Sequence, residues 1–259
     1  MTLKALIWDV DGMLAETERD GHRVAFNRAF NACGLPWRWS IPRYGELLSI
    51  AGRRERLMHD MGARTDAPTR PAQRDALARL LHRRKNAIYA EIVAAGAITL
   101  RPGVRELIAE ARERGVRQAV VTTTSRSNVE ALLHAQLGAS WADTVDLSIC
   151  GEDVAAKKPH PEAYLEALRR LRLRPLEALA IEDSPGEAGA ARAAEVPVIV
   201  TRSLYFAAST FDAAAAIGPG LDRREGWRPG LPACAGLGRI ALKDLRAWQQ
   251  CKEQLSQVA

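Results

Sequence analysis

The chain has 259 residues, of which 47% are hydrophobic and 26% are charged, and its formal net charge at pH 7 is +6. This composition is typical of a globular protein with a sizeable core, and it excludes an intrinsically disordered chain. No segment approaches the roughly 20 consecutive apolar residues of a membrane span, and the first residues lack the hydrophobic region of a signal peptide. We therefore expect a cytoplasmic protein without a membrane partner.

A positive net charge is compatible with a nucleic-acid partner or with a small anionic substrate. The densest basic segment, residues 79–85, has apolar residues between its basic ones and lacks the aromatic side chains that stack on single-stranded bases. We expect this segment to form the solvated face of a helix. The sequence indicates no nucleic-acid partner and no obligatory protein partner.

The first predicted element is a short apolar strand from Lys4 to Val10, which runs into an acidic turn. From Glu16 to Ile98 the pattern is helical, broken by glycine and proline, and it contains no strand signal. A stretch of this length can form a small domain. We expect residues 16–98 to be an all-helical domain, inserted into a core domain that consists of residues 1–15 and 99–259.

Beyond residue 99, helices and strands alternate along the chain. The predicted helices cover 104–114, 127–138, 161–171 and 186–194, and the predicted strands cover 117–122, 145–150, 178–181 and 196–201. This alternation predicts a Rossmann-like α/β core, a doubly wound parallel sheet that binds ligands at the carboxyl ends of its strands. The tail beyond Ser203 is rich in Ala, Gly and Pro until a terminal helix, predicted from Leu242 to Leu255.

Asp9 and Asp11 follow the first strand and are two residues apart. Gly12 allows a sharp turn behind them, so both carboxylates can face the same crevice. Two close carboxylates repel each other unless a cation or a shared proton lies between them, and oxygen ligands beside a phosphate favour Mg²⁺. The alternative is a pair of aspartates that cap a turn.

Hydroxyl groups follow another strand, from Thr122 to Ser125, and lead into a helix N-terminus, where free N–H groups favour a phosphate. They could equally be ordinary helix caps. Farther along, Lys158 is held directly before Pro159 at the entrance of a helix. It is placed to neutralise clustered acids and a phosphate, with a solvent-facing loop lysine as the alternative. We expect its neighbour Lys157 to be solvated.

A second acid pair, Glu182 and Asp183, ends another apolar strand, and paired oxygens of this kind suit a metal site. A helix N-cap is the alternative for Asp183. The acid pair, the hydroxyl group, the lysine and the second acid pair thus occur in this order, each after a different apolar strand. In this order and placement the chain resembles the haloacid dehalogenase (HAD) superfamily, over roughly residues 4–201.

This resemblance implies a phosphoric monoester hydrolase in which Asp9 is the nucleophile and forms an aspartyl-phosphate. Asp11 would be the general acid for the leaving group and then the base for water. Thr122 and the backbone N–H of Thr123 would bind phosphoryl oxygens. Lys158 would screen Asp9 from the incoming dianion.

The resemblance also implies Mg²⁺ as the cofactor. Its ligands would be the carboxylates of Asp9, Glu182 and Asp183 and the backbone carbonyl of Asp11. A dehalogenase of this superfamily does not need the second acid of the first motif. The presence of Asp11 therefore favours a phosphatase.

The helical insertion resembles the C1-type cap of the β-phosphoglucomutase and phosphoglycolate phosphatase branch, a domain that closes over the substrate and excludes water. Within this branch, residues 14–26 and 44–52 are similar to the CbbY-type phosphatases that are associated with Rubisco in the Calvin cycle. That resemblance implies a sugar bisphosphate as the substrate, xylulose-1,5-bisphosphate in particular. The alternatives are a phosphomutase, another sugar-phosphate or phosphoglycolate phosphatase, and a non-catalytic binding module.

A bisphosphate needs a second anion site, and guanidinium groups bind phosphate in a bidentate manner. The candidates are Arg53, Arg54 and Arg56 in the cap and Ser125 and Arg126 beside the hydroxyl motif. The candidates for binding sugar hydroxyls are Glu16, Glu18, His22 and Tyr44. Glu18 and His22 also have the spacing of a surface pair, and Tyr44 could serve packing alone. Arg53 and Arg54 depart from the CbbY-type pattern, in which we expect Gly and Lys.

Overall fold

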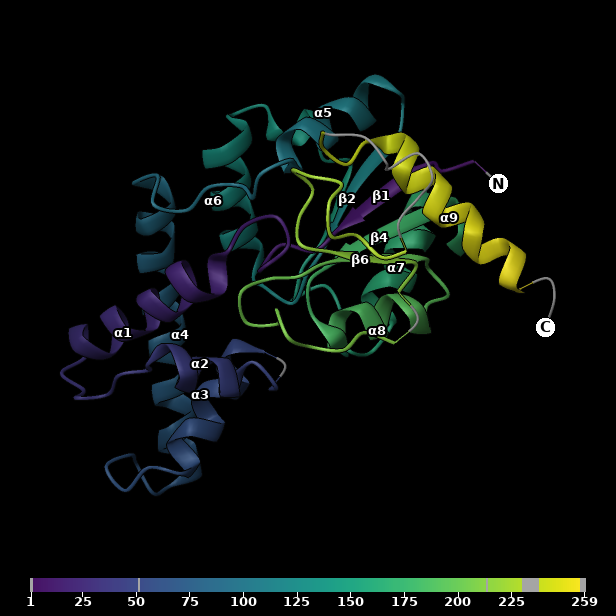
Figure 1. Cartoon of the computed structure of the whole chain (residues 1–259). Coiled ribbons are helices and arrows are strands. Elements are labelled where there is room, and N and C mark those ends of the chain that lie inside the picture. Colours follow the sequence, from purple (N-terminus) through teal and green to yellow (C-terminus); the bar gives the residue numbers. More distant parts are fainter. Residues whose placement is uncertain (1, 51, 213, 230–237, 257–259) are drawn as a thin grey trace.

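The computed structural model describes residues 2–50, 52–212, 214–229 and 238–256. A parallel sheet with helices on both faces forms one part of the molecule, and a group of helices lies beside it (Figure 1). No helix within the described ranges is long and apolar enough to cross a membrane. The predicted α/β core is confirmed.

The sheet has six described strands, all parallel, in the order β3-β2-β1-β4-β5-β6. The strands are β1 (Ala5–Trp8), β2 (Arg117–Val121), β3 (Leu147–Ile149), β4 (Ala178–Glu182), β5 (Val198–Thr201) and β6 (Ala216–Gly218). The first five coincide with predicted strands to within two residues at each end. β6 was not predicted, because Ile217 is its only large apolar side chain and its three residues form no hydrophobic pattern.

Side chains alternate along each strand, so the sheet buries two separate layers. In β1, Leu6 and Trp8 belong to the first layer, and Ala5 and Ile7 belong to the second. The first layer is covered by α5 (Val104–Glu113), α6 (Arg126–Leu137) and α9 (Leu242–Ser256), and the second by α7 (Glu162–Leu171) and α8 (Pro185–Ala193). Burial on both faces explains why these strands are continuous apolar runs in the sequence.

The described residues between 16 and 98 form helices and no strand, as predicted. The elements are a π-helical turn η1 (Glu18–His22), α1 (Arg23–Ala32), α2 (Ile41–Leu47), α3 (Arg53–Gly62) and α4 (Pro71–Ala94). Phe26, Phe30, Trp37 and Trp39 pack together in a core that these helices share. This separate core supports our proposal that residues 16–98 form a cap domain.

Helix α4 joins the cap to the rest of the protein. Ala78 and Leu81, in its first half, belong to the aromatic core of the cap. Ile88 and Ile92, in its second half, belong to the first layer of the sheet. The long helix therefore packs in both hydrophobic clusters.

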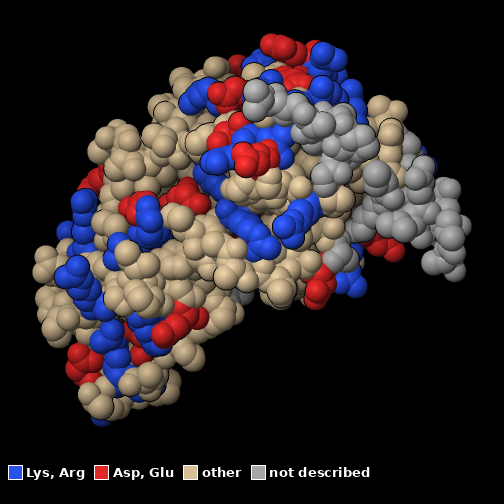
Figure 2. Space-filling view, in the orientation of Figure 1, with Lys and Arg blue, Asp and Glu red and all other residues tan. Residues whose placement is uncertain are grey.

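The basic segment at 79–85 lies on α4 and is only partly solvated. Arg79 and Arg83 are exposed, but Lys85 is fully buried, with its ammonium 4.9 Å from the ring centroid of Tyr89. The prediction of a solvated face is therefore wrong for Lys85, because packing of α4 against the protein covers that side of the helix. On the face shown in Figure 2, acidic side chains lie among the basic ones, so the positive charge forms no continuous stripe there.

Strand β1 occupies the position where the strand order reverses, with β2 on one side and β4 on the other. In an open parallel sheet, ligands bind outside the carboxyl ends of the strands at such a position. The residues that follow β1, β2 and β4 therefore meet at one edge of the sheet.

Candidate active site

Asp9 follows β1 and is completely buried next to Lys158 and Glu182. Nζ of Lys158 lies 2.9 Å from Oδ1 of Asp9 and 2.7 Å from Oε1 of Glu182, so one ammonium group joins two of the sequence motifs. The hydroxyl of Tyr164 on α7 also donates to Oε1 of Glu182. Burial and the Glu187 carboxylate raise the pKa of Asp9 to about 8, although Lys158 opposes the rise. The ionised form of Asp9 therefore depends on nearby positive charge.

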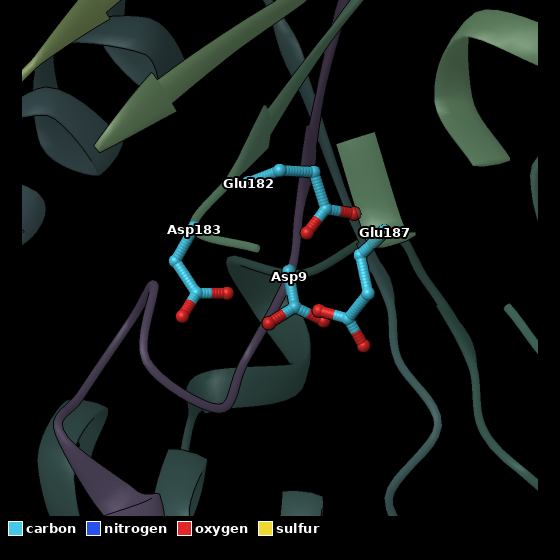
Figure 3. A group of neighbouring side chains, drawn as sticks. All are labelled: Asp9, Glu182, Asp183 and Glu187. Carbon is cyan, nitrogen blue, oxygen red and sulfur yellow. The ribbon is translucent and has the colours of Figure 1, made fainter. Parts of the chain in front are cut away.

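Four carboxylates converge beyond the ends of β1 and β4 (Figure 3). Asp9, Glu182, Asp183 and Glu187 each offer one oxygen, and these oxygens lie within 4.8 Å of one another. Among the described residues, Oδ2 of Asp9, Oε2 of Glu182 and Oδ1 of Asp183 are buried without a hydrogen-bond partner. Oxygen ligands of this kind fit Mg²⁺, and a bound cation would satisfy these three atoms.

Gly12 allows the first motif to pack directly against this carboxylate cluster. Its φ is +93°, which lies in the left-handed region that favours glycine. A Cβ atom at this position would lie 2.0 Å from Oδ2 of Asp183. The sharp turn predicted after Asp11 is confirmed, and the close approach to Asp183 explains why it needs a glycine.

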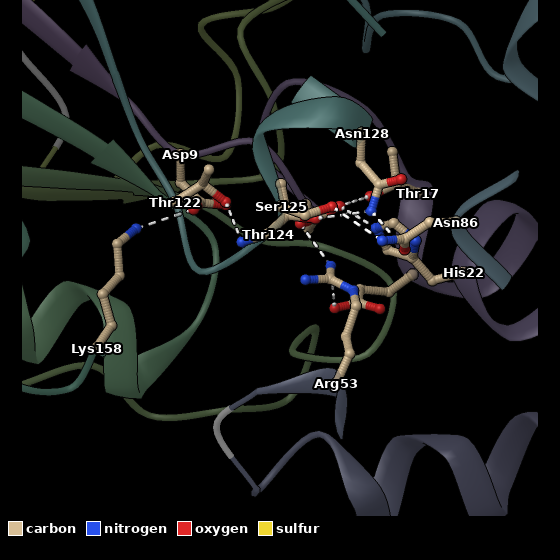
Figure 4. A network of polar contacts seen from close by, with 12 residues as sticks. Asp9, Thr17, His22, Arg53, Asn86, Thr122, Thr124, Ser125, Asn128 and Lys158 are labelled. Carbon is tan, nitrogen blue, oxygen red and sulfur yellow. Dashed lines mark hydrogen bonds and ion pairs between the residues drawn. The ribbon is translucent and has the colours of Figure 1, made fainter. Parts of the chain in front are cut away.

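The side chain of Asp11 contacts the cap, within the polar network that Figure 4 shows around Thr17, His22 and Arg53. Oδ1 of Asp11 accepts from the Thr17 hydroxyl and lies 2.7 Å from Nε2 of His22, and Oδ2 lies 2.6 Å from Nη2 of Arg53. Burial would raise the pKa of Asp11, but Arg53 and His22 hold it well below its usual range. Burial also lowers the pKa of His22 to about 3, so a neutral imidazole donates to an ionised Asp11.

Two buried arginines of α3 form the cap side of the site. Arg53 and Arg56 contact Oε1 of Glu18 at 3.3 Å and 3.2 Å, and the Tyr44 hydroxyl donates to Oε2 of Glu18 at 2.5 Å. Burial would raise the pKa of Glu18, but the two arginines lower it to about 2. Glu18 and His22 thus have separate buried partners, and the surface pair considered from their spacing is not formed.

Two cavities lie between the core and the cap. The first, of about 310 Å³, is lined by Asp11, Lys158 and Asp183 from the core and by Glu18 and Arg56 from the cap. The second, of about 340 Å³, has more basic than acidic side chains in its wall: Arg53, Arg54, Arg79, Arg83 and Lys157, with Glu55 and Glu152. Thr123 borders both cavities, so they lie side by side.

The hydroxyl motif follows β2, as predicted, but only part of it borders a cavity. Thr122 is buried, and its Oγ1 accepts a hydrogen bond at 3.2 Å from the backbone N–H two residues later. Thr123 borders both cavities and Ser125 borders the second. Arg126 borders neither, since its guanidinium pairs at 2.6 Å with Asp153. A part for Arg126 in phosphate binding stays a prediction.

Three other residues considered from the sequence lie at the margin of the site. The carboxylate of Glu16 accepts from the backbone N–H of Leu204 at 3.3 Å and borders neither of the two cavities. Arg54 borders the second cavity from an exposed position, and its Nη1 lies 3.8 Å from Oδ1 of Asp75 on α4. Lys157 was expected to be solvated, but it forms an ion pair with Glu55 of α3 at 3.3 Å and so connects core and cap.

Several residues of the site were not identified from the sequence. The available signal for Glu187 was its place in the first turn of a helix, four residues after Asp183. Thr17 lies within residues 14–26, the stretch that resembles the CbbY-type phosphatases, but a lone threonine after no strand gave no separate signal for a contact with Asp11. Nδ2 of Asn128 on α6 donates to Oδ1 of Asn86 on α4 at 3.2 Å. This hydrogen bond extends the network of Figure 4 across the junction between cap and core.

Comparison with known proteins assigns this arrangement to a family. Residues 3–195 match the model of the haloacid dehalogenase-like hydrolases. The chain is 43% identical to protein CbbY of Cupriavidus necator, over 95% of this chain and 96% of that protein. It is 36% identical to a CBBY-like protein of Arabidopsis thaliana, over 82% of this chain and 67% of that protein.

Solved structures agree with the sequence comparison. CbbY from Rhodobacter sphaeroides, solved in complex with phosphate, is 40% identical and superimposes with a TM-score of 0.76, over 82% of this chain and 92% of that one. A mutant of the same protein, with the same identity and TM-score, was solved in complex with xylulose-1,5-bisphosphate. The resemblance inferred from the four motifs is confirmed: the chain belongs to the haloacid dehalogenase-like hydrolase family and is a phosphatase related to the CbbY proteins.

Proposed function

We propose that the protein is a Mg²⁺-dependent phosphatase that hydrolyses xylulose-1,5-bisphosphate. The observation that carries the proposal is a buried carboxylate, Asp9, held by Lys158 beside unpartnered acidic oxygens and close to two cavities with arginines in their walls. The substrate is supported by the complex of the CbbY relative with this compound. The predicted cytoplasmic location stays a prediction.

The proposed reaction has two steps. Asp9 attacks the phosphorus atom to form an aspartyl-phosphate, while Asp11 gives a proton to the departing sugar oxygen. In the second step, Asp11 takes a proton from the water that attacks the aspartyl-phosphate, and inorganic phosphate is released. Thr122 and the N–H of Thr123 hold phosphoryl oxygens, and the ammonium of Lys158 offsets their charge.

The residues present fit a bound Mg²⁺. It would be held by Asp9, Glu182 and Asp183 and by the backbone carbonyl of Asp11, and when bound it would offset the negative charge of the phosphoryl group. Lys158 contacts only one oxygen each of Asp9 and Glu182, and the other oxygen of each remains without a partner among the described residues.

The contact between Arg53 and Asp11 bears on the choice of substrate. Asp11 is ionised in the free protein, so it must gain a proton before it can protonate the leaving oxygen. The Nε atom of Arg53 is buried and has no hydrogen-bond partner in the part of the chain that the structure describes, and the residue borders the second cavity. We propose that the second phosphate of the substrate binds in this cavity and draws Arg53 away from Asp11, which a monophosphate cannot do.

Phosphate release from a panel of substrates tests the proposed function. The panel contains xylulose-1,5-bisphosphate, ribulose-1,5-bisphosphate, phosphoglycolate and β-glucose-1-phosphate, each with and without Mg²⁺. We expect Mg²⁺-dependent release that is selective for the first compound. Release from another compound would keep the phosphatase and reject this substrate, and a rearranged phosphate ester without inorganic phosphate would show a phosphomutase.

Replacing Arg53 with Ala is expected to lower the preference for a bisphosphate over a monophosphate by about tenfold or more, because a charge-assisted hydrogen bond contributes roughly 1.5–3 kcal/mol. The measurement is kcat/KM for xylulose-1,5-bisphosphate and for the two xylulose monophosphates, which carry the phosphate at C1 or at C5. Arg38→Ala, at an exposed position of the cap, is the control and should keep the parent ratio. A parent-like ratio in Arg53→Ala would contradict the assigned role.

A further inference from the structure

Glu187 is a fourth carboxylate in the acidic cluster, and the four sequence motifs do not include it. It lies in the first turn of α8, where Pro185 begins the helix and the Ser184 hydroxyl accepts from the Glu187 N–H at 3.4 Å. This helix N-cap sets the direction of the first turn of α8. The Glu187 side chain therefore extends toward Asp9 and the end of β4 (Figure 3). The carboxylate is only partly exposed and borders the first cavity.

The three neighbouring carboxylates, those of Asp9, Glu182 and Asp183, each have one buried oxygen without a hydrogen-bond partner among the described residues. Lys158 bonds Oδ1 of Asp9 and Oε1 of Glu182, and the opposite oxygens, Oδ2 and Oε2, are buried without a partner among the described residues. Oδ1 of Asp183 is also buried without a partner among the described residues. Buried polar atoms in native proteins nearly always have a partner, so these three atoms indicate a bound ligand that is a cation.

The charges at this point also indicate a cation. Among the described residues, Lys158 is the one basic residue in an ion pair with any of Asp9, Glu182, Asp183 and Glu187. Carboxylates this close repel one another, and the repulsion is relieved by a proton or by a metal ion. Hard oxygen donors in this number favour a divalent cation such as Mg²⁺, Mn²⁺ or Ca²⁺.

We propose that Glu187 is a further ligand of the divalent cation, in addition to Asp9, Glu182, Asp183 and the Asp11 carbonyl. The inference rests on the proposed function, which it deepens by adding a ligand at the same site. The extra carboxylate strengthens cation binding in the absence of substrate. It also widens the range of cations that bind, because Ca²⁺ accepts six to eight oxygen ligands whereas Mg²⁺ requires an octahedron and retains water.

Glu187→Gln keeps the size of the side chain and removes its charge. Calorimetric titration of chelator-treated protein with MgCl₂, MnCl₂ and CaCl₂ measures the affinity without any substrate. We expect at least about tenfold weaker binding of each cation, with the largest loss for Ca²⁺. Loss of less than tenfold for all three cations would overturn the proposal.

Two further measurements make the result specific. Glu195→Gln changes an exposed glutamate just beyond the other end of α8 and should bind the cations as the parent does. Thermal unfolding without metal should show Glu187→Gln at least as stable as the parent, because one of four repelling carboxylates has become neutral. Weaker cation binding would stand even if the substrate panel released no phosphate, whereas parent-like binding would reject Glu187 as a ligand and leave the phosphatase proposal intact.

Discussion

Asp9→Asn should abolish phosphate release, with a loss of at least about 10³-fold in kcat, because a neutral amide oxygen cannot form the aspartyl-phosphate of the proposed reaction. Asp9 is completely buried and lies 2.9 Å from Nζ of Lys158, so the isosteric amide keeps the space filled. Release of inorganic phosphate from xylulose-1,5-bisphosphate in the presence of Mg²⁺ is the measurement. More than a tenth of the parent rate would refute Asp9 as the nucleophile.

The same variant should fold and still bind substrate. Burial and the Glu187 carboxylate raise the pKa of Asp9 to about 8 against the opposing effect of Lys158, as expected where burial disfavours the charged form. Removing that charge is therefore expected to leave the unfolding temperature without metal unchanged or higher. Calorimetry with xylulose-1,5-bisphosphate separates a loss of chemistry from a loss of binding, and retained binding is the expected result.

Lys158→Met is expected to lower kcat/KM by at least about 10²-fold, because it removes the ammonium that contacts Asp9 and Glu182 and, in the proposed reaction, offsets the charge of the phosphoryl group. Both contacts of Nζ are short, at 2.9 Å and 2.7 Å, and the side chain is buried. Breaking a buried ion pair from one side commonly costs about 3–5 kcal/mol, so the unfolding free energy should fall as well.

A lysine at the other end of β1 provides the matched control. Lys4 pairs with Glu177 at 2.8 Å, and its side chain is 52% exposed. An exposed pair contributes about 1 kcal/mol or less, so Lys4→Met should have little effect on stability and none on turnover. Equal losses of activity in the two variants would show that the effect of Lys158→Met reflects general destabilisation and not the chemistry at Asp9.

The sheet could be predicted from the sequence because its central strands are buried on both faces. β1, β2 and β4 are short strands with buried apolar residues. Asp9 and Thr122 directly follow β1 and β2, while Glu182 ends β4 and Asp183 follows it. The carboxyl ends of adjacent parallel strands lie at one edge, so the convergence of these residues followed from the strand assignments alone. β6 could not be predicted, because a three-residue strand with one large apolar side chain has no hydrophobic pattern.

The contacts between cap and core could not be predicted in the same way. Arg53 reaches Asp11 over 42 positions in the chain, and the choice of partner depends on how α3 packs above the sheet edge. The sequence places Lys85 in a solvated basic face, whereas in the structure the packing of α4 buries it. Hydrophobic periodicity reports which side of a helix is apolar, but it does not report which charged residue the neighbouring domain covers.

By itself, the sequence determined the fold class, the all-helical character of residues 16–98 and the candidate catalytic residues at the ends of the strands. These features depend on local patterns: apolar runs, the residue after a strand, and a glycine where the backbone must turn. The tertiary structure alone decided that Arg53 and His22 hold Asp11 ionised and that Glu187 joins the other three carboxylates. These features depend on distances between segments far apart in the chain, and only the packed protein defines such distances.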